Sequence, residues 1–575
     1  MKFRWFIAPP QPLLADRLAA ELRISSLLAQ CLINRGISDA RLISEFLDPR
    51  LRHLSDPFLL PQMESAVERL FRARERDEAL VVFGDYDVDG VTSTALLLEV
   101  FEALGWKAHA YLPNRMDEGY GLSQEGVDNC LKKFPVSLLL AIDCGSTAVQ
   151  TIDALRARNV DVIVVDHHQI SSPPPAAVAL VNPQALPANP LVPYTEFCSV
   201  GLAFKLAHAL VKRGRELKIP AALDYDLRPL LDLVALGTIA DLVPLTGENR
   251  ILVSAGLERL NRTRRPGLVA LKNVARATSP IGTFETGFQL APRLNAAGRL
   301  ETAEEALRLL LARTLPEAMP IAQSLDARNR ERQKIERSIV DEVIATVRSR
   351  FDPAKDFVIV EGRLLWHIGV VGIVASRVLQ EFYRPTIIIG GDGENWRGSG
   401  RSIAGFDLAA ALRQCDDLLL RHGGHAMAAG VSIAAKNLDA FRERLNDIAR
   451  QSLKPEDLHP PLRIDAEIRL ADVHLENLIE LDRLRPTGQG NPPFQFCTVR
   501  VAHRRPLQRI GTDKQHVKMW LTDGTTTHEA VWWGAGNGSL PVGSFDVAFI
   551  PRLQQYNGQR SVQLQLLDWK QSGSS

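Results

Sequence analysis

The residues whose spacing most strongly suggests chemistry lie in an acidic stretch near residue 85. Asp85, Asp87 and Asp89 occupy alternate positions directly after the apolar run Val81–Phe83. Alternate side chains of an extended segment point to the same side, so we expect the carboxylates to converge. Converging carboxylates repel one another unless a cation lies between them, and hard divalent cations prefer oxygen ligands. The stretch therefore indicates a divalent-metal site.

Two plainer interpretations of this stretch remain open. One is an acidic turn between a strand and a helix, and the other is a calcium loop. A calcium loop of the EF-hand kind would need a glutamate at a fixed later position. The segment after Gly90, Val91–Leu98, favours a helix whose first turn offers hydroxyls and backbone N–H groups to an anion.

The chain around these aspartates alternates short apolar strands with helical segments. That alternation is typical of a parallel sheet covered on both faces. In such folds, ligands bind at the carboxyl ends of the strands, so polar residues that follow the strands should meet at one edge. The predicted strands are Val81–Phe83, Ala108–Leu112, Val136–Ile142 and Val160–Val165.

Several aspartates and histidines stand at those strand ends or at the end of a later predicted helix, Leu230–Ala240. A mixed carboxylate and imidazole set suits manganese or magnesium, and histidine shifts the preference toward manganese. A histidine at a strand end is by itself more often a packed core or surface residue, so the whole set carries the prediction. Its members are Asp87, Asp89, Asp143, His167, His168 and Asp241.

The composition is that of an ordinary globular protein. The chain has 575 residues, 46% of them hydrophobic, and a formal net charge of +1, so any basic surface must be local. The six cysteines are scattered, which argues against a disulfide framework or a thiolate zinc site and favours the cytoplasm. The first residues do not resemble a signal peptide, and no apolar run is long enough to span a bilayer.

We expect an α/β multidomain protein built from five parts. A long helix should connect two α/β domains, and turn-rich strands after Pro460 predict a small β-barrel of OB type. The parts are a helical N-terminal cap at 1–75, a parallel-sheet catalytic domain at 76–300, a helical connector at 301–352, a second α/β domain at 353–455, and the OB-like nucleic-acid-binding domain at 460–575.

Within the connector, Pro316 and Pro320 are expected to break the helix, which leaves Ala322–Arg350 as one helix about 45 Å long. The run Asp326–Lys334 is strongly charged. Its plain interpretation is a solvated helix face, and the alternative is a rigid connector whose arginines line a substrate channel.

Glycine-rich segments of the second α/β domain suggest places where a backbone approaches an anion. They are Gly369–Arg377, Gly398–Ser402 and His422–Gly430, although each is equally compatible with a structural turn. In the barrel, aromatic residues with basic neighbours suggest a surface that stacks bases and binds phosphates, while some of the rings must be core. Those aromatic residues are Trp520, Trp532, Trp533 and Tyr556.

The acidic stretch Asp85–Gly90, together with Ile142–Gly145 and Asp166–His168, resembles the motifs of the DHH phosphoesterase superfamily. Later segments resemble its RecJ branch of single-strand exonucleases, and the resemblance extends over nearly the whole chain. It implies a DHH domain, a DHHA1 accessory domain and an OB domain. The segments are Leu112–Arg115, Gly119–Leu122, Gly237–Pro244, Leu290–Arg299, Gly398–Ser402 and Gly423–Gly430.

The resemblance also implies roles for individual residues around two Mn²⁺ or Mg²⁺ ions. Asp85 would be an auxiliary carboxylate, and His168 would contact the scissile phosphate. Phe83 stands where other branches carry a histidine ligand, which implies a metal shell with one imidazole fewer. The implied metal ligands are Asp87, Asp89, Asp143, His167 and Asp241.

Arginines complete the expected site, because a guanidinium offers a planar fork to phosphate oxygens. Arg293 and Arg299 flank a small-residue turn, and the alternative for each is a structural salt bridge. Arg299 would join His168 in stabilising the reacting phosphate. The resemblance places a further set at the 5′-phosphate and along the DNA strand: Arg115, Ser399, Arg401 and His425.

The expected function is a metal-dependent 5′-to-3′ exonuclease that hydrolyses single-stranded DNA with two metals, releases 5′-mononucleotides and serves recombination and repair. The residues themselves argue for metal-dependent phosphodiester hydrolysis. Single-stranded DNA, the polarity, cooperation with single-strand-binding protein and a helicase, and a monomeric state rest on the resemblance.

Two alternatives to this function remain. The first is a small-substrate hydrolase on the same site, such as a nanoRNase, a cyclic-dinucleotide phosphodiesterase or a pyrophosphatase, which would not need the extra β domain. The second is a non-catalytic DNA-binding scaffold, which would be expected to have lost metal ligands that are all present here.

Overall fold

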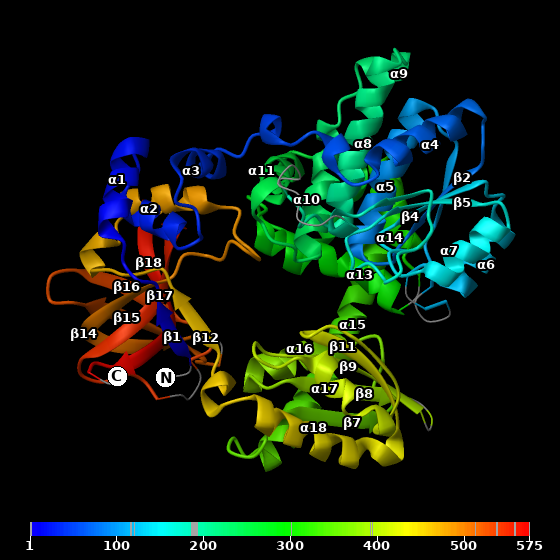
Figure 1. Ribbon diagram of the computed structural model, residues 1–575. Coiled ribbons are helices and arrows are strands. Elements are labelled where there is room, and N and C mark those ends of the chain that lie inside the picture. The colour runs from blue at the N-terminus through cyan, green and yellow to red at the C-terminus, as the bar shows by residue number, and fades with distance from the viewer. Residues whose placement is uncertain are drawn as a thin grey trace. The chain divides into compact units, whose positions relative to one another are not determined.

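The computed structural model describes residues 3–114, 118–119, 121–185, 194–300, 302–391, 393, 395–511, 513–535, 539–556 and 559–573. The chain forms two compact units (Figure 1). The parallel-sheet unit comprises Ser44–Glu331 and Leu484–Pro492. The barrel unit comprises Met1–Ile43, Arg332–Arg483 and Pro493–Ser575.

A five-stranded, wholly parallel sheet forms the centre of the parallel-sheet unit. The four predicted strands are confirmed. The sheet also contains a fifth strand, only three residues long, that was not predicted. In spatial order the strands are β3 (Ala108–Tyr111), β2 (Leu80–Gly84), β4 (Leu138–Ile142), β5 (Asp161–Val165) and β6 (Ala179–Val181). Strands β2, β4, β5 and β6 are almost fully buried because helices cover both faces, whereas the edge strand β3 is partly exposed.

Long helices on one face of this sheet carry most of the core. They are α4 (Met63–Glu75), α5 (Val88–Leu104), α8 (Ser199–Glu216) and α10 (Leu231–Ala240), while α6 (Gln124–Lys133) and α7 (Val149–Ala157) cover the other face. The remaining helices are α3 (Ala40–Leu47), η1 (Leu51–His53), η2 (Pro57–Leu59), η3 (Pro183–Ala185), α9 (Pro220–Leu223), η4 (Arg228–Leu230), α11 (Gly247–Asn261), α12 (Pro266–Ala275), the π-helix η5 (Glu285–Leu290), α13 (Ala291–Leu300) and α14 (Glu304–Leu311).

The connecting helix α15 runs from Leu315 to Arg350, so the predicted start at Ala322 is wrong. Pro320 lies inside the helix. Proline removes one backbone hydrogen bond but its fixed φ is compatible with a helix, and buried Ala318, Ala322 and Leu325 hold this part of α15 in the core.

The charged run on α15 is not only a solvated face. Asp326, Asn329 and Arg332 are buried, whereas their neighbours Arg330 and Glu331 are exposed. The two burial classes alternate at helical spacing, so one face of the run packs inward and the other meets solvent. The plain interpretation of this run is therefore wrong for three of its nine residues, Asp326, Asn329 and Arg332.

The second α/β domain, in the barrel unit, contains a mixed five-stranded sheet. The segment Gly398–Ser402 is mostly a strand, and His422–Gly430 is a hairpin with exposed His425 near its turn. In spatial order the strands are β10 (Leu419–Gly424), β11 (Ala428–Ala434), β9 (Asn395–Arg401), β8 (Thr386–Gly391) and β7 (Ile359–Leu364). The helices are α16 (Val371–Phe382), α17 (Leu408–Arg413), η6 (Asp416–Leu418), η7 (Ala435–Asn437) and α18 (Leu438–Ser452).

The predicted OB-type barrel is confirmed. Five strands pair side by side, and an additional pairing of β14 with β17 closes the barrel. On these strands, Arg505 stacks its guanidinium 3.5 Å from the Trp520 ring centroid, and Trp533, in the turn directly after β16, is half exposed. The strands are β14 (Phe496–Ile510), β15 (His516–Thr522), β16 (Thr527–Trp532), β17 (Phe545–Tyr556) and β18 (Gln559–Gln571), with β13 (Ala466–Glu467) beside β14.

The N-terminal segment departs from the expected helical cap. Residues Arg4–Ile7 form strand β1, which pairs in parallel with β12 (Pro461–Ile464). Arg35 then forms an ion pair of 2.9 Å with Asp465, which ties the segment to the barrel unit. The partner strand is distant in the sequence, so no local pattern reveals β1. The other helices here are α1 (Pro12–Leu22), α2 (Ser26–Ile33), η8 (Pro455–Leu458), η9 (Leu470–Asp472), α19 (Leu475–Leu481) and η10 (Asp482–Leu484).

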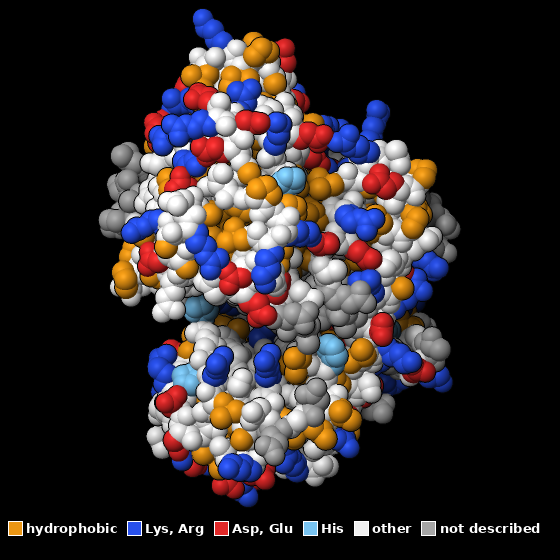
Figure 2. Space-filling model, turned by 90° about the vertical axis from the view of Figure 1, so that its right-hand side faces the viewer, with side chains coloured by type: hydrophobic (Ala, Val, Ile, Leu, Met, Phe, Trp, Pro, Cys, Tyr) orange, Lys and Arg blue, Asp and Glu red, His pale blue; other side chains and the backbone are white. Residues whose placement is uncertain are grey.

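The surface shown in Figure 2 mixes charges of both signs. Lys and Arg side chains lie between Asp and Glu side chains over most of that face, which agrees with the net charge of +1. No helix in the described parts of the chain combines the length and apolar character needed to cross a membrane.

Candidate metal centre

The turn from β2 into α5 positions the first carboxylates. Asp87 is the N-cap of α5, and its Oδ1 accepts the backbone N–H groups of Asp89 at 2.9 Å and Gly90 at 3.2 Å. Asp89 therefore lies in the first helical turn, so the extended geometry predicted for all three aspartates is wrong. The turn requires glycine at 90, because a Cβ there would lie 2.5 Å from the Asp85 carbonyl oxygen.

The N-terminus of α8 holds Asp89 in place. The backbone N–H of Ser199 donates to Asp89 Oδ2 at 2.7 Å, and the N–H of Val200 donates to Oδ1 at 2.8 Å. Both oxygens point to a helix N-terminus, which favours negative charge. Burial nevertheless raises the pKa of Asp89 to about 7, with a further contribution from the charge of Asp87, so the carboxyl is poised to ionise when a cation arrives.

Asp143 follows β4 and adopts a left-handed backbone conformation with φ of 64°. Its Oδ1 accepts a hydrogen bond of 2.8 Å from the hydroxyl of Ser199, so one serine contacts two candidate ligands. Burial and the charges of Asp89 and Asp87 raise the pKa of Asp143 well above its ordinary value. Sequence reasoning missed Ser199, because nothing in its local sequence marks a lone serine as a partner of distant carboxylates.

Asp241 comes to the same place from the end of α10. Gly237 lets α10 pack closely on α5, because a Cβ there would collide with Thr92 and lie 3.2 Å from Asp89 Oδ1. Burial and the charges of Asp89 and Asp87 raise the pKa of Asp241 to about 9. The helix predicted to deliver this aspartate is confirmed.

The geometry around His167 is that expected of a cation site. His167 Nε2 lies 3.6 Å from Asp143 Oδ1, 3.6 Å from Asp241 Oδ2 and 4.0 Å from Asp89 Oδ2. These separations exceed hydrogen-bond length but suit ligands that share one ion at about 2.1 Å. Among the described residues, His167 Nε2 and Asp241 Oδ2 are buried and find no hydrogen-bond partner. The donor set therefore fits a divalent metal.

Three groups of potential ligand atoms lie together in the described parts of the chain. They are Asp143 with His167 and His168, Asp89 with Cys198 and Asp241, and Asp85 with Asp87 and Asp143; the atoms of each group lie within 4.8 Å of one another. Asp143 belongs to two groups, an arrangement that suits two neighbouring ions. Cys198 was not predicted, and burial raises the pKa of its thiol well above the ordinary value, which makes it a poor ligand.

The two adjacent histidines have opposite electrostatic environments. Burial and the charge of His168 lower the pKa of His167 to about 4, which keeps it neutral as a metal ligand must be. Burial would also lower the pKa of His168, but a hydrogen bond of 2.7 Å and the charge of Asp166 outweigh it and raise that pKa to about 9. His168 is therefore a cationic donor beside the centre.

The other predicted residues have separate positions. Phe83 is a core ring stacked on Tyr111, in agreement with its expected inability to bind metal. Arg293 donates to Asp326 at 2.9 Å, which is the structural ion pair considered as its alternative. Arg115 and the side chain of Arg299 lie outside the described residues. Ser399, Arg401 and His425 belong to the barrel unit, where Arg401 Nη1 donates to Ser399 Oγ at 2.9 Å.

Comparison with known families finds three domains in the order expected from the sequence. Residues 79–238 match the N-terminal domain of the DHH family, residues 355–451 match the DHHA1 domain, and residues 464–568 match the RecJ OB domain. The first match includes every candidate ligand except Asp241.

Curated relatives are similar over nearly the full length. The chain is 35% identical to the single-stranded-DNA-specific exonuclease RecJ of Dickeya dadantii, covering 94% of this chain and 95% of the relative. It is also 35% identical to the RecJ of Escherichia coli, with 95% and 96% covered. Among solved structures, RecJ of Thermus thermophilus in complex with Mn²⁺ matches with a TM-score of 0.85 at 30% identity, covering 100% of this chain and 80% of that one. The same protein in complex with Mg²⁺ matches with a TM-score of 0.79 at 29% identity, covering 100% and 79%.

Proposed function

The chain belongs to the RecJ family of single-stranded-DNA-specific exonucleases, and on this premise we propose that it removes 5′-mononucleotides stepwise from the 5′ end of single-stranded DNA at the centre described above. It is a metal-dependent nuclease that uses Mn²⁺ or Mg²⁺. One observation supports the location most directly: the buried nitrogen of His167, unpartnered among the described residues, faces carboxylate oxygens of Asp143 and Asp241 at 3.6 Å.

The proposed metal ligands are four carboxylates and one imidazole, of which Asp89 and Asp143 are buried and the others partly buried. When bound, the metal ions supply a water of lowered pKa and neutralise charge on the phosphate oxygens. The α8 N-terminus fixes Asp89, and the Ser199 hydroxyl fixes Asp143, so both carboxylates are oriented before the substrate arrives. Asp85 would support this set as an auxiliary carboxylate. The ligands are Asp87, Asp89, Asp143, His167 and Asp241.

His168 is proposed to hold the reacting phosphate. Asp166 Oδ1 accepts a hydrogen bond of 2.7 Å from the His168 ring nitrogen Nδ1, which orients the ring. The same carboxylate raises the pKa of His168 to about 9, so the ring is protonated at neutral pH. A protonated imidazole donates a charge-assisted hydrogen bond to a phosphate oxygen. This bond becomes stronger as negative charge builds on that oxygen in the transition state. Arg299 is proposed to add a second cationic donor.

Selection of the 5′ end is proposed to depend on Arg115, Ser399 and Arg401, which would hold the terminal phosphate. The bond from Arg401 to Ser399 supports this role, because it orients the guanidinium fork. His425 is proposed to contact the strand nearby. Arg293 is proposed to bind substrate through the part of its guanidinium that Asp326 and the Gln289 carbonyl leave available.

The substrate is single-stranded DNA. We further propose a monomer that acts with single-strand-binding protein and a helicase in recombination and repair. All six cysteines are buried free thiols, which supports the proposal that the protein works in the reducing cytoplasm.

A digestion time course tests the proposal. The substrates are end-labelled single-stranded DNA, the matching duplex, the matching RNA and a dinucleotide, each with Mn²⁺ or Mg²⁺ and with EDTA as the control. We expect label to be released first from the 5′ end of single-stranded DNA. Release first from the 3′ end would overturn the polarity, and hydrolysis confined to the dinucleotide would move the chain to the small-substrate alternative.

A further inference from the structure

Two phenylalanines of the parallel-sheet unit face solvent as a stacked pair. Phe284 is 60% exposed and Phe288 is 70% exposed. Their ring centroids lie 5.1 Å apart with an angle of 28° between the planes. Phenylalanine is usually buried, so two adjacent exposed rings in a parallel arrangement indicate a surface that something flat and apolar covers.

The support beneath the two rings is well ordered. Asn261 exchanges two hydrogen bonds of 2.8 Å with the backbone of Ile281, and the Thr283 hydroxyl donates to the Thr487 carbonyl at 2.9 Å. Glu285 then accepts from the N–H of Gly282 at 2.8 Å as the chain enters the π-helix η5. Short π-helical segments occur frequently at functional sites. The rings are therefore displayed by a fixed element and not by a loose loop.

The same element is continuous with the metal centre. At Gly287, η5 packs on α10: a Cβ there would lie at an ordinary contact distance, 3.5 Å, from Cγ2 of Ile239, which stands two residues before Asp241. At its other end η5 leads into α13, whose Asn295 accepts the N–H of Val88 at 3.1 Å and so caps the acidic turn. Leu242, directly after Asp241, is 71% exposed. An apolar surface therefore adjoins the carboxylates.

We propose that Phe284 and Phe288 form a base-stacking platform that holds a nucleobase of the DNA strand beside the metal centre. This inference rests on the proposed function, because it assigns the strand at that centre a place to lie. Every base offers a π face, so such a platform binds without sequence preference. The bases of a duplex are already stacked on their neighbours, and only a single strand can offer a free face to these rings.

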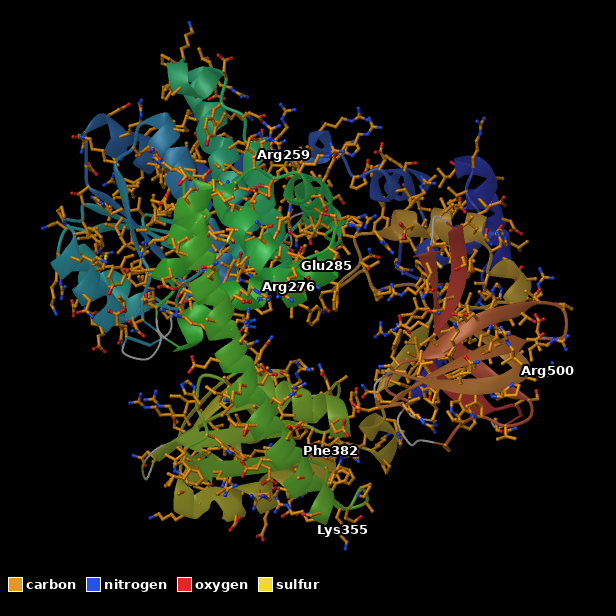
Figure 3. All side chains as sticks on the ribbon, turned by 180° about the vertical axis from the view of Figure 1, so that it is seen from behind. Arg259, Arg276, Glu285, Lys355, Phe382 and Arg500 are labelled. Carbon is orange, nitrogen blue, oxygen red and sulfur yellow. The ribbon has the colours of Figure 1, made fainter. Side chains whose placement is uncertain are left out.

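A basic residue ends a helix that contacts η5. Helix α12 contacts η5, and Arg276 ends α12 with an exposed side chain; Figure 3 shows Arg276 and Glu285 near one another on this unit. An arginine on the helix packed against η5, together with the open rings, matches a ligand with both a phosphate and a base. This combination favours a nucleic-acid strand over a purely apolar peptide as the occupant.

The test compares the full-length enzyme with the variants Phe284→Leu, Phe288→Leu and the double variant. Leucine keeps an apolar side chain but removes the ring. Leu223→Ala, at a half-exposed position on α9 of the same unit, is the matched control. Steady-state KM and kcat are measured on single-stranded DNA and on the same oligonucleotide with abasic sites near its 5′ end. Base stacking is worth about 1–3 kcal/mol per base, so we expect the double variant to raise KM by about 5- to 100-fold with kcat nearly unchanged.

Further readouts separate stacking from a structural role. The abasic substrate should have a higher KM than the normal substrate with the parent enzyme, and the double variant should not raise that KM further. The variant Phe288→Trp keeps an aromatic ring, so its KM on normal DNA should equal that of the parent enzyme, unlike the KM of Phe288→Leu. In EDTA, an oligonucleotide carrying 2-aminopurine should lose fluorescence on binding the parent enzyme and keep it with the double variant.

The outcomes also separate this inference from the proposed function. An unchanged KM for the double variant, or an equal increase on both substrates, overturns the platform while the exonuclease assignment stands. A parent enzyme that degrades no single-stranded DNA overturns the function itself.

Discussion

Ser199 offers the sharpest test of how the centre is organised. Its hydroxyl donates to Asp143 Oδ1 at 2.8 Å, and its backbone N–H donates to Asp89. Ser199→Ala removes only the first of these bonds, since the backbone N–H remains. Ser199 is fully buried, so no water molecule from the solvent replaces the lost hydroxyl donor.

The size of the effect follows from that bond. A hydrogen bond to a charged group contributes about 1.5–3 kcal/mol, and loss of a residue that orients a metal ligand typically lowers metal affinity by about 10- to 100-fold. We expect Ser199→Ala to weaken Mn²⁺ binding within that range. Saturating Mn²⁺ should restore most of the exonuclease activity, because the ligands themselves are intact.

Ser93 provides a matched control in the same core. It is also fully buried, but its hydroxyl has no hydrogen-bond partner within the described residues. Ser93→Ala therefore deletes the same atom without touching a ligand. Calorimetric titration with Mn²⁺ and the Mn²⁺ dependence of DNA digestion measure both variants. Equal Mn²⁺ requirements for Ser199→Ala, Ser93→Ala and the parent enzyme would refute the reasoning.

Four further predictions follow from the same geometry. Asp143→Ala should abolish cleavage without unfolding the protein; full Mn²⁺-dependent activity together with a normal thermal transition would contradict its role as a shared ligand. Arg401→Ala should reduce the preference for 5′-phosphorylated over 5′-hydroxyl ends by about tenfold, because a charge-assisted hydrogen bond is lost, and competition between the two ends measures it. In EDTA, the folded-state pKa values of about 7 for Asp89 and about 9 for Asp241 lie above the unfolded value of 3.8, so their contribution to stability is complete below about pH 4 and lost as pH rises through 7 to 9. Thermal unfolding at increasing pH should show this decline in stability, and added Mn²⁺ should reverse it. A decline of the same size in Asp241→Asn would contradict the assignment of the effect to Asp241. Asp166→Asn should lower the pKa of His168 from about 9 toward its ordinary 6.5, so the alkaline limit of kcat moves to lower pH; an unchanged pH–rate profile would show that His168 does not act as a cation.

The parallel sheet and most of the polar residues at its edge can be predicted from the amino-acid sequence. In apolar runs such as Val136–Ile142, side chains on both faces of the strand must be buried, so these runs predict strands of a parallel sheet that helices cover on both faces. The carboxyl ends of parallel strands meet at one edge, which is why Asp143 and His167 were predicted together although they are distant in the chain. The barrel can be predicted from the sequence equally well, because alternating strands and turns are local patterns.

The contacts that hold those residues depend on the packing of the folded chain. Asp89 was predicted on an extended segment, but the cap formed by Asp87 begins the helix at Val88 and turns Asp89 toward α8. Arg293 was predicted to bind phosphate, and its ion pair with Asp326 depends on how α13 and α15 pack. The proline at 320 was predicted to end a helix that the surrounding core keeps continuous.

The reason is the range of the interactions involved. Whether a segment is a strand depends on its own pattern of apolar residues, which the sequence displays directly. Which donor satisfies a buried carboxylate depends on segments that are far apart in the chain and become neighbours only through packing, as Ser199 and Asp143 do. The same holds for the acidic turn, where the Val88 N–H donates to the side-chain oxygen of Asn295. The identities of the candidate ligands are therefore readable in the sequence, whereas the hydrogen bonds that orient them and the exposed pair of phenylalanine rings belong to the folded chain.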